Sequence, residues 1–194
     1  RLSIDREKKK ILQTLTRQIL DAGEILLLNM ETLVEFDFIH ARAKLAKLMQ
    51  ARRCNIELGC RLQLNKALNP ELILNGQNVI PNDIAWDQSI HVIIISGPNT
   101  GGKTVTLKTV GLMSLMARSG LFLPVDKGSY IPFYPEIYAD IGDDQNIGLS
   151  LSTFSAHLKK IIHIINHAAS GSLILLDELG IATDPQEGAS LAEA

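Results

Sequence analysis

The chain has 194 residues, of which 46% are hydrophobic, and its formal net charge at pH 7 is −2. This length is enough for one large domain, or for one domain with part of another, and the composition can supply a sizeable core. The near-neutral charge excludes a generally basic nucleic-acid-binding surface, so nucleic acid would have to be contacted through local patches or through other parts of the protein. No apolar run approaches the length of a transmembrane helix, so we expect no contact with a membrane.

The cysteines and the ends of the chain give two further expectations. Cys54 and Cys60 are too widely spaced for a C-x-x-C motif and no secretory segment is visible, so we interpret them as reduced thiols of a cytoplasmic protein. The chain starts at Arg1 without an initiator Met and stops at Ala194 inside a predicted helix. We therefore expect a fragment of a longer protein.

The N-terminal part is predicted to be helical. Apolar residues recur at roughly helical spacing over residues 4–29. Thr32 followed by Glu35 has the form of a capping box, which predicts a second helix over residues 33–50. The residues expected to face inward on this second helix are Phe36, Ile39, Ala43, Ala46 and Met49.

Near residue 54 the pattern changes to short strands and turns. Residues 54–90 are predicted to be rich in strands, with a turn at Asn69-Pro70. The apolar run at 92–95 predicts a buried strand, and a helical pattern follows over residues 104–117. This alternation indicates an α/β domain over residues 54–194, preceded by a helical segment over residues 1–53.

The segment between the apolar run and the helix carries a phosphate-binding motif. Residues 97–104 read G-P-N-T-G-G-K-T and fit the P-loop pattern G-x-x-x-x-G-K-[ST]. Its glycines let backbone amides curl around phosphate oxygens, and the helix N-terminus adds its positive end. We expect Lys103 to reach the β- and γ-phosphates of ATP and the Thr104 hydroxyl to bind Mg²⁺. The predicted nucleotide-binding residues are Gly97, Pro98, Asn99, Thr100, Gly101, Gly102, Lys103, Thr104 and Val105.

After the P-loop helix, short strands are predicted at residues 121–125 and 137–141, and the stretch from 130 to 138 is expected to be mostly irregular. An acidic loop at residues 142–146 leads to a helix that is expected to open at Ser152.

Three histidines lie on this predicted helix. His163 and His167 are spaced four residues apart, which can hold a metal ion, but their segment lacks the glutamate of the H-E-x-x-H motif. We interpret these two as surface histidines.

A second half of the nucleotide site follows the next apolar run. Residues 173–176 have the continuous hydrophobicity of a buried parallel strand and end in Asp177 and Glu178. A carboxylate at the C-terminal end of such a strand lies where α/β sheets bind ligands. Asp177 is expected to hold Mg²⁺ and Glu178 to act as the base for the attacking water.

The three motifs together resemble the MutS family of ABC-class ATPases. The resemblance rests on G-P-N-T-G-G-K-T at 97–104, S-T-F at 152–154 and D-E-L-G at 177–180, and it covers the chain from about residue 34 onward. The segments at 104–112, 139–145 and 183–189 are similar to the type-2 branch of the family. The resemblance implies a three-layer P-loop fold with a mixed sheet flanked by helices, and it assigns residues 1–53 to the end of the family's helical core.

The resemblance also implies a homodimeric mechanism. ATPases of this class enclose ATP between the P-loop of one subunit and the signature helix of the other. Ser152, with Thr153, is then expected to face the nucleotide of the partner subunit. Asn99 would contact the γ-phosphate or the attacking water, and Asp144 and Gln145 would lie in a loop that couples nucleotide state to nucleic-acid binding.

Type-2 members are associated with branched DNA and suppression of recombination, and in some bacteria with stalled or collided ribosomes. Many carry a C-terminal Smr nuclease domain. The resemblance therefore implies an ATPase whose nucleic-acid or ribosome contacts lie in other parts of the protein.

Two other functions remain open on the residues alone. One is a mismatch-recognition MutS of DNA repair, which an upstream mismatch-binding domain would identify. The other is an ATP-gated dimerisation module without significant turnover.

Overall fold

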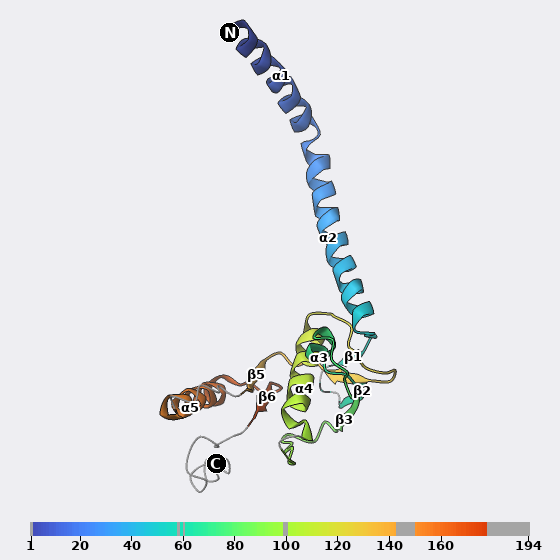
Figure 1. The fold of residues 1–194 in the computed structure, drawn as a ribbon, viewed down its shortest axis with the longest axis vertical. Coiled ribbons are helices and arrows are strands. Elements are labelled where there is room, and N and C mark those ends of the chain that lie inside the picture. The colour runs from blue at the N-terminus through green and yellow to red at the C-terminus, as the bar shows by residue number, and fades with distance from the viewer. Residues whose placement is uncertain (1, 58, 60, 99–100, 143–149, 178–194) are drawn as a thin grey trace. The chain divides into compact units, whose positions relative to one another are not determined.

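The computed structural model describes residues 2–57, 59, 61–98, 101–142 and 150–177 of an α/β chain. The chain divides into two compact units, residues 1–45 and 46–194 (Figure 1). No helix within the described ranges is long and apolar enough to cross a membrane.

The first unit contains two successive helices, α1 (Leu2–Asp21) and α2 (Gly23–Leu48), of which α2 continues into the second unit. The predicted boundary at Thr32 is wrong, because the helices are separated at Ala22 and Thr32 lies inside α2. The Thr32 hydroxyl donates a hydrogen bond to the Leu28 carbonyl at 2.9 Å, a bond that threonine commonly makes within a helix. Thr32 therefore does not cap a helix.

The prediction of a buried face on the second helix is also largely wrong. Phe36 and Ile39 are 66% and 55% exposed. Only Met49, just beyond the end of α2, is buried. A helical apolar pattern indicates a face that packs, but within the described part of the first unit this face has no covering element.

The second unit begins with a mixed four-stranded sheet. Its strands are β1 (Asn55–Glu57), β2 (Leu62–Ala67), β3 (Asn82–Trp86) and β4 (Tyr130–Pro132), in the order β1-β4-β2-β3. β1 pairs with β4 in parallel, whereas β2 pairs with both β3 and β4 in antiparallel orientation. The prediction of a strand-rich region from residue 54 to 90 is confirmed, and β4 lies in a stretch that was expected to be irregular.

A second sheet has two strands, one of which leads to Asp177 of the candidate site. β5 (Ile137–Asp140) and β6 (Leu173–Leu176) pair in parallel, and α5 (Ser150–His167) connects them. Both strands were predicted, and the helix begins two residues earlier than expected.

Two helices lie near the P-loop. The short α3 (Pro70–Leu74) has Asn69 as its N-cap, so the turn predicted at Asn69-Pro70 is instead a helix start. The longer α4 (Lys103–Arg118) follows the P-loop as predicted. At its end the N–H of Gly120 donates to the Ala117 carbonyl and the N–H of Leu121 to the Met116 carbonyl, which is a Schellman motif.

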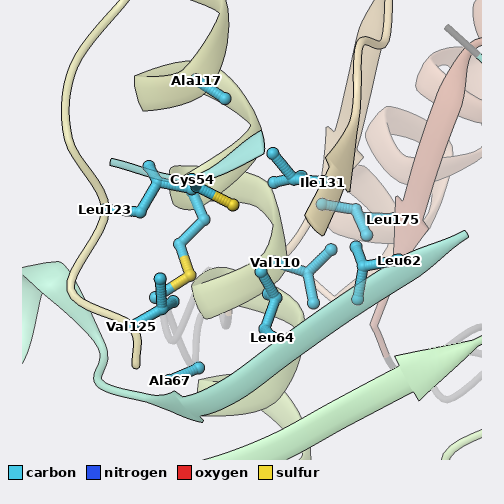
Figure 2. Packing of buried hydrophobic residues seen from close by; sticks show 11 residues of the cluster. Cys54, Leu62, Leu64, Ala67, Val110, Ala117, Leu123, Val125, Ile131 and Leu175 are labelled. Carbon is cyan, nitrogen blue, oxygen red and sulfur yellow. The ribbon is translucent and has the colours of Figure 1, made fainter. Parts of the chain in front are cut away.

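The core of the second unit joins α4 to both sheets. Figure 2 shows Leu175 of β6 beside Val110 of α4, Leu62 of β2 and Ile131 of β4. The buried cluster consists of Cys54, Leu62, Leu64, Ala67, Val110, Met113, Ala117, Leu123, Val125, Ile131 and Leu175. Because α4 contributes to the same core as β6, this packing fixes the helix that follows the P-loop against the strand that leads to Asp177.

Two predicted strands are absent from the described sheets. Residues 92–95 belong to neither sheet, and their side chains are exposed, with Val92 at 78% and Ile94 at 87%. A buried parallel strand needs neighbours that cover its faces, and neither described sheet supplies them here. The predicted strand at 121–125 is reduced to a single bridge between Arg52 and Leu123, because Pro124 has no N–H to donate to a ladder.

Candidate functional site

Within the P-loop, a glycine directly precedes α4. Gly102 is the N-cap of the helix and has a φ of 78°, in the left-handed region that glycine adopts without strain. The preceding Gly101 donates its N–H to the Pro98 carbonyl at 2.8 Å. The first-turn amides of α4 have no partners further back in a regular helix, which makes them suitable donors for an anion.

The Lys103 side chain lies along the loop that precedes it. Its ammonium group donates to the Gly97 carbonyl at 2.7 Å and to the Pro98 carbonyl at 3.0 Å. The positive charge is therefore held beside the carbonyls of Gly97 and Pro98.

The two halves of the site meet through Thr104 and Asp177. The Thr104 hydroxyl, in the first turn of α4, donates to Oδ2 of Asp177 at 2.6 Å. Both side chains are half-buried. A hydroxyl and a carboxylate provide the hard oxygen ligands that Mg²⁺ prefers, so the residues present fit this ion.

Main-chain pairing fixes Asp177 at the end of β6. Its N–H donates to the Asp140 carbonyl at 2.9 Å and continues the β5–β6 ladder by one step. Val105, next to Thr104, uses its carbonyl to accept the Thr109 hydroxyl at 2.6 Å. The positions of Thr104 and Asp177 thus follow from regular secondary structure on both sides.

A second carboxylate, Asp140, lies beside this site and was missed by the sequence reasoning. It is the last residue of β5 and is only 5% exposed. Oδ2 of Asp140 is 2.6 Å from Nδ1 of His157, and Oδ1 accepts from Nζ of Lys160 at 3.0 Å. Burial raises the pKa of Asp140, but the hydrogen bonds and charges of His157 and Lys160 outweigh burial, so the pKa lies below the ordinary value of 3.8.

His157 is therefore partly buried, with its side chain 28% exposed, and its pairing with Asp140 was not predicted. The spacing of His157 and Lys160 places them on one face of a helix, and this was the available signal. It gave no indication of which acidic residue they face. His163 and His167 are exposed, as predicted, and their rings stack at 4.1 Å. No group of three or more His, Cys, Asp or Glu side chains able to hold a metal occurs among the described residues.

The remaining predicted site residues divide into two groups. Ser152 and Thr153 lie in the first turn of α5. Asn99, Thr100, Asp144, Gln145 and Glu178 lie outside the described residues.

The chain is similar in sequence to a known protein family and to several of its members. A family model described as MutS domain V matches residues 93–194. The chain is 46% identical over 187 residues to an endonuclease MutS2 of Shouchella clausii, a match that covers 96% of this chain and 24% of that protein. It is 47% identical over 188 residues to an endonuclease MutS2 of Caldicellulosiruptor bescii, covering 97% of this chain and 24% of the relative.

A putative endonuclease MutS2 of Bacillus subtilis is 46% identical over 186 residues, which are 96% of this chain and 23% of that protein. The chain therefore spans less than a quarter of the length of each of these three relatives.

Proposed function

Because this chain belongs to the MutS family and represents part of a type-2 member, we propose that it is the module that binds and hydrolyses ATP in that protein. The observation that carries the proposal is the 2.6 Å hydrogen bond between the Thr104 hydroxyl and the Asp177 carboxylate. It joins the start of the P-loop helix to the end of an apolar parallel strand, which is the arrangement required for one divalent cation held from two sides. The proposed domain of the ABC ATPase class extends over residues 54–194.

Each residue has a definite task in this proposal. The backbone amides of Gly97–Thr104 and the start of α4 bind the phosphates. The Lys103 ammonium group exchanges its hydrogen bonds with the loop carbonyls for contacts with the β- and γ-phosphates. Thr104 and Asp177 hold Mg²⁺, which when bound neutralises charge on the phosphates. Glu178 accepts a proton from the attacking water, and Asn99 orients that water or the γ-phosphate.

We propose that the active unit is a homodimer. Ser152 and Thr153 lie in the first turn of α5, and a helix N-terminus with hydroxyl side chains suits an anion. The ligand proposed for them is the γ-phosphate of ATP bound to the partner subunit. Asp144 and Gln145, which precede α5 in the sequence, are proposed to couple the nucleotide state to the rest of the protein.

The partners of the complete protein are proposed to be branched DNA, with suppression of recombination as the outcome, or collided ribosomes. The relatives are named endonucleases, and we propose that the complete protein also carries a nuclease, outside this chain. Binding of the full-length protein to a four-way DNA junction, a matched linear duplex and ribosomes, each with and without Mg-ATP, separates these partners.

The test of the ATPase proposal uses Glu178→Gln and Thr104→Ala in the full-length protein. Loss of a general base lowers kcat by ~100-fold or more, so Glu178→Gln is expected to bind ATP but not to turn it over. Thr104→Ala removes one proposed ligand and should raise the Mg²⁺ concentration for half-maximal turnover by about tenfold, or ~1.4 kcal/mol. Steady-state phosphate release and equilibrium nucleotide binding measure these effects.

Ser114→Ala is the matched control for Thr104→Ala. Ser114 also lies on α4, and its hydroxyl donates to the Val110 carbonyl at 2.8 Å instead of to Asp177. It should leave the Mg²⁺ requirement unchanged. Unaltered turnover in Glu178→Gln would refute the assignment of the base, and negligible turnover of the wild type with ATP-dependent dimerisation would favour an ATP-gated dimerisation module.

A further inference from the structure

The carboxylate of Asp140 is an anchor point for α5. Both of its side-chain partners, His157 and Lys160, lie on α5, at 2.6 and 3.0 Å. A carboxylate that is 5% exposed is costly to bury unless it is paired, and here both of its oxygens have a cationic or N–H partner. The pairing therefore favours one position of α5 against the end of β5.

The main chain of the same residue belongs to the ATP site of its own subunit. The Asp140 carbonyl accepts the N–H of Asp177 at 2.9 Å. This bond uses only backbone atoms, so a change in the Asp140 side chain can release α5 without removing the support of Asp177. The two roles of Asp140 can thus be separated by substitution.

The anchored part of α5 lies close to its N-terminal turn. Ser152 precedes His157 by five residues on the same helix, which corresponds to about 7.5 Å along the axis. A helical segment of this length moves as one piece, so fixing His157 and Lys160 also fixes the turn that holds Ser152.

We propose that Asp140 is a positioning residue that acts on ATP hydrolysis in the other subunit, by holding α5 where Ser152 can reach the partner's nucleotide. This inference rests on the proposed function. The inference has one distinguishing consequence. Loss of the Asp140 carboxylate should impair the ATP site of the partner subunit, which α5 of the mutated chain contacts, and should leave the P-loop of the mutated chain intact.

The first experiment measures steady-state ATPase activity of the full-length Asp140→Asn variant. The amide is neutral and has one acceptor oxygen where the carboxylate has two, so it loses the charge attraction to Lys160 and holds the two partners on α5 more weakly. We expect kcat to fall by ~10-fold or more, because a misplacement of about 1 Å can cost on the order of 100-fold. The KM for ATP should change by less than about twofold, since the phosphate cradle is intact.

Substitutions at three positions on α5 refine this result. Lys160→Ala should lower kcat in the same direction, whereas the neighbouring Lys159→Ala, which removes the same charge from an exposed position, should not. His157→Asn retains an N–H donor near the position of Nδ1 and should keep more activity than His157→Ala. Equal losses in Lys159→Ala and Lys160→Ala would contradict the anchor.

The decisive experiment uses mixed dimers, obtained by co-expressing two differently tagged subunits and purifying on both tags. Asp140→Asn subunits are paired with Glu178→Gln subunits, and the reference pairs wild type with Glu178→Gln. In the mixed dimer only the Asp140→Asn subunit retains Glu178 and can hydrolyse ATP. The ATP bound to that subunit faces α5 of the Glu178→Gln subunit, in which Asp140 is unchanged. We expect activity within about twofold of the reference, because the defect acts across the dimer.

A mixed dimer that remains ~10-fold below its reference would overturn the inference and show that Asp140 acts within its own subunit or on folding. Unchanged kcat in the Asp140→Asn homodimer would overturn it as well. Failure of the proposed function is recognised separately, by a Glu178→Gln homodimer as active as the wild type or by a wild type without Mg-dependent turnover.

Discussion

At the scale of single residues, Gly111 sets how closely α4 can approach β6. A Cβ atom added at Gly111 would lie 2.7 Å from Cδ1 of Leu175, a distance at which one of the two must move. Leu175 is buried in the core, so its side chain has little room to shift (Figure 2). The absence of a side chain at Gly111 thus lets α4 pack onto the strand that leads to Asp177.

We predict that Gly111→Ala destabilises the domain by about 1–2 kcal/mol through overpacking. This corresponds to a melting temperature lower by roughly 2–8 °C. The measurement is thermal unfolding of the full-length protein, using the transition that Mg-ATP raises, because a ligand stabilises the domain to which it binds.

Gly23→Ala is the matched control for Gly111→Ala. Gly23 begins α2 and has no atom within 4 Å of an added Cβ, so this change should be neutral or stabilising. The double variant Gly111→Ala with Leu175→Ala should lose less stability than the sum of the two single changes, because removing the leucine relieves the contact. Additive losses would contradict the proposed clash.

Sequence motifs can predict that side chains far apart in the chain lie close together. The two Walker-type motifs assigned Thr104 and Asp177 to one cation, and their side chains are hydrogen-bonded in the structure. Their role as metal ligands stays a prediction. The pairing of Asp140 with His157 and Lys160 could not be predicted, because it depends on which strand end faces α5 and leaves no recurring sequence pattern.

At the scale of elements, Asn69 connects two helices. Its side-chain oxygen accepts the N–H of Leu72 at 3.1 Å as the N-cap of α3, and its Nδ2 donates to the Thr109 hydroxyl of α4 at 2.9 Å. Asn69 is buried, so neither bond is readily replaced by water. The residue therefore fixes α3 beside the P-loop helix.

We predict that Asn69→Ala lowers the stability of the domain by about 2 kcal/mol, combining the loss of an N-cap with that of a buried hydrogen bond. The same Mg-ATP-sensitive thermal transition measures the effect. Asn69→Ser keeps a capping oxygen but is too short to reach Thr109, so it should lose about half as much. A serine variant as unstable as the alanine variant would show that capping contributes nothing here.

The elements that were predicted correctly have strong local signals. α4 follows a P-loop and ends just before Ser119-Gly120, and β6 is a continuous apolar run. The capping box at Thr32 failed because the same residues are compatible with the interior of a helix, and only the continuation of α2 decides between the two. Local chemistry defines possible boundaries, and the surrounding chain selects among them.

At the scale of the whole molecule, the α/β class could be predicted but the pairing of strands could not. Parallel pairing of β1 with β4 joins residues 55–57 to residues 130–132, and no turn motif indicates such a contact. Residues 92–95 show the opposite case, since their composition predicts a buried strand and the structure leaves their side chains exposed. Four consecutive exposed aliphatic residues are unfavourable in water and indicate a surface that becomes covered.

We predict that residues 92–95 become protected when the full-length protein binds Mg-ATP. Ser96 alone separates this run from Gly97 of the P-loop, so contacts of the loop with phosphates would hold the run in place for strand pairing. Backbone amides that enter a ladder exchange hydrogen more slowly, and we expect at least ~10-fold slower exchange for a peptide spanning 92–95. The peptide over β3, which is already paired, serves as the control and should change little. If 92–95 exchanges equally fast with and without Mg-ATP while nucleotide binding is saturated, the run is not a strand of the nucleotide-bound domain, and its apolar side chains must be covered in another way.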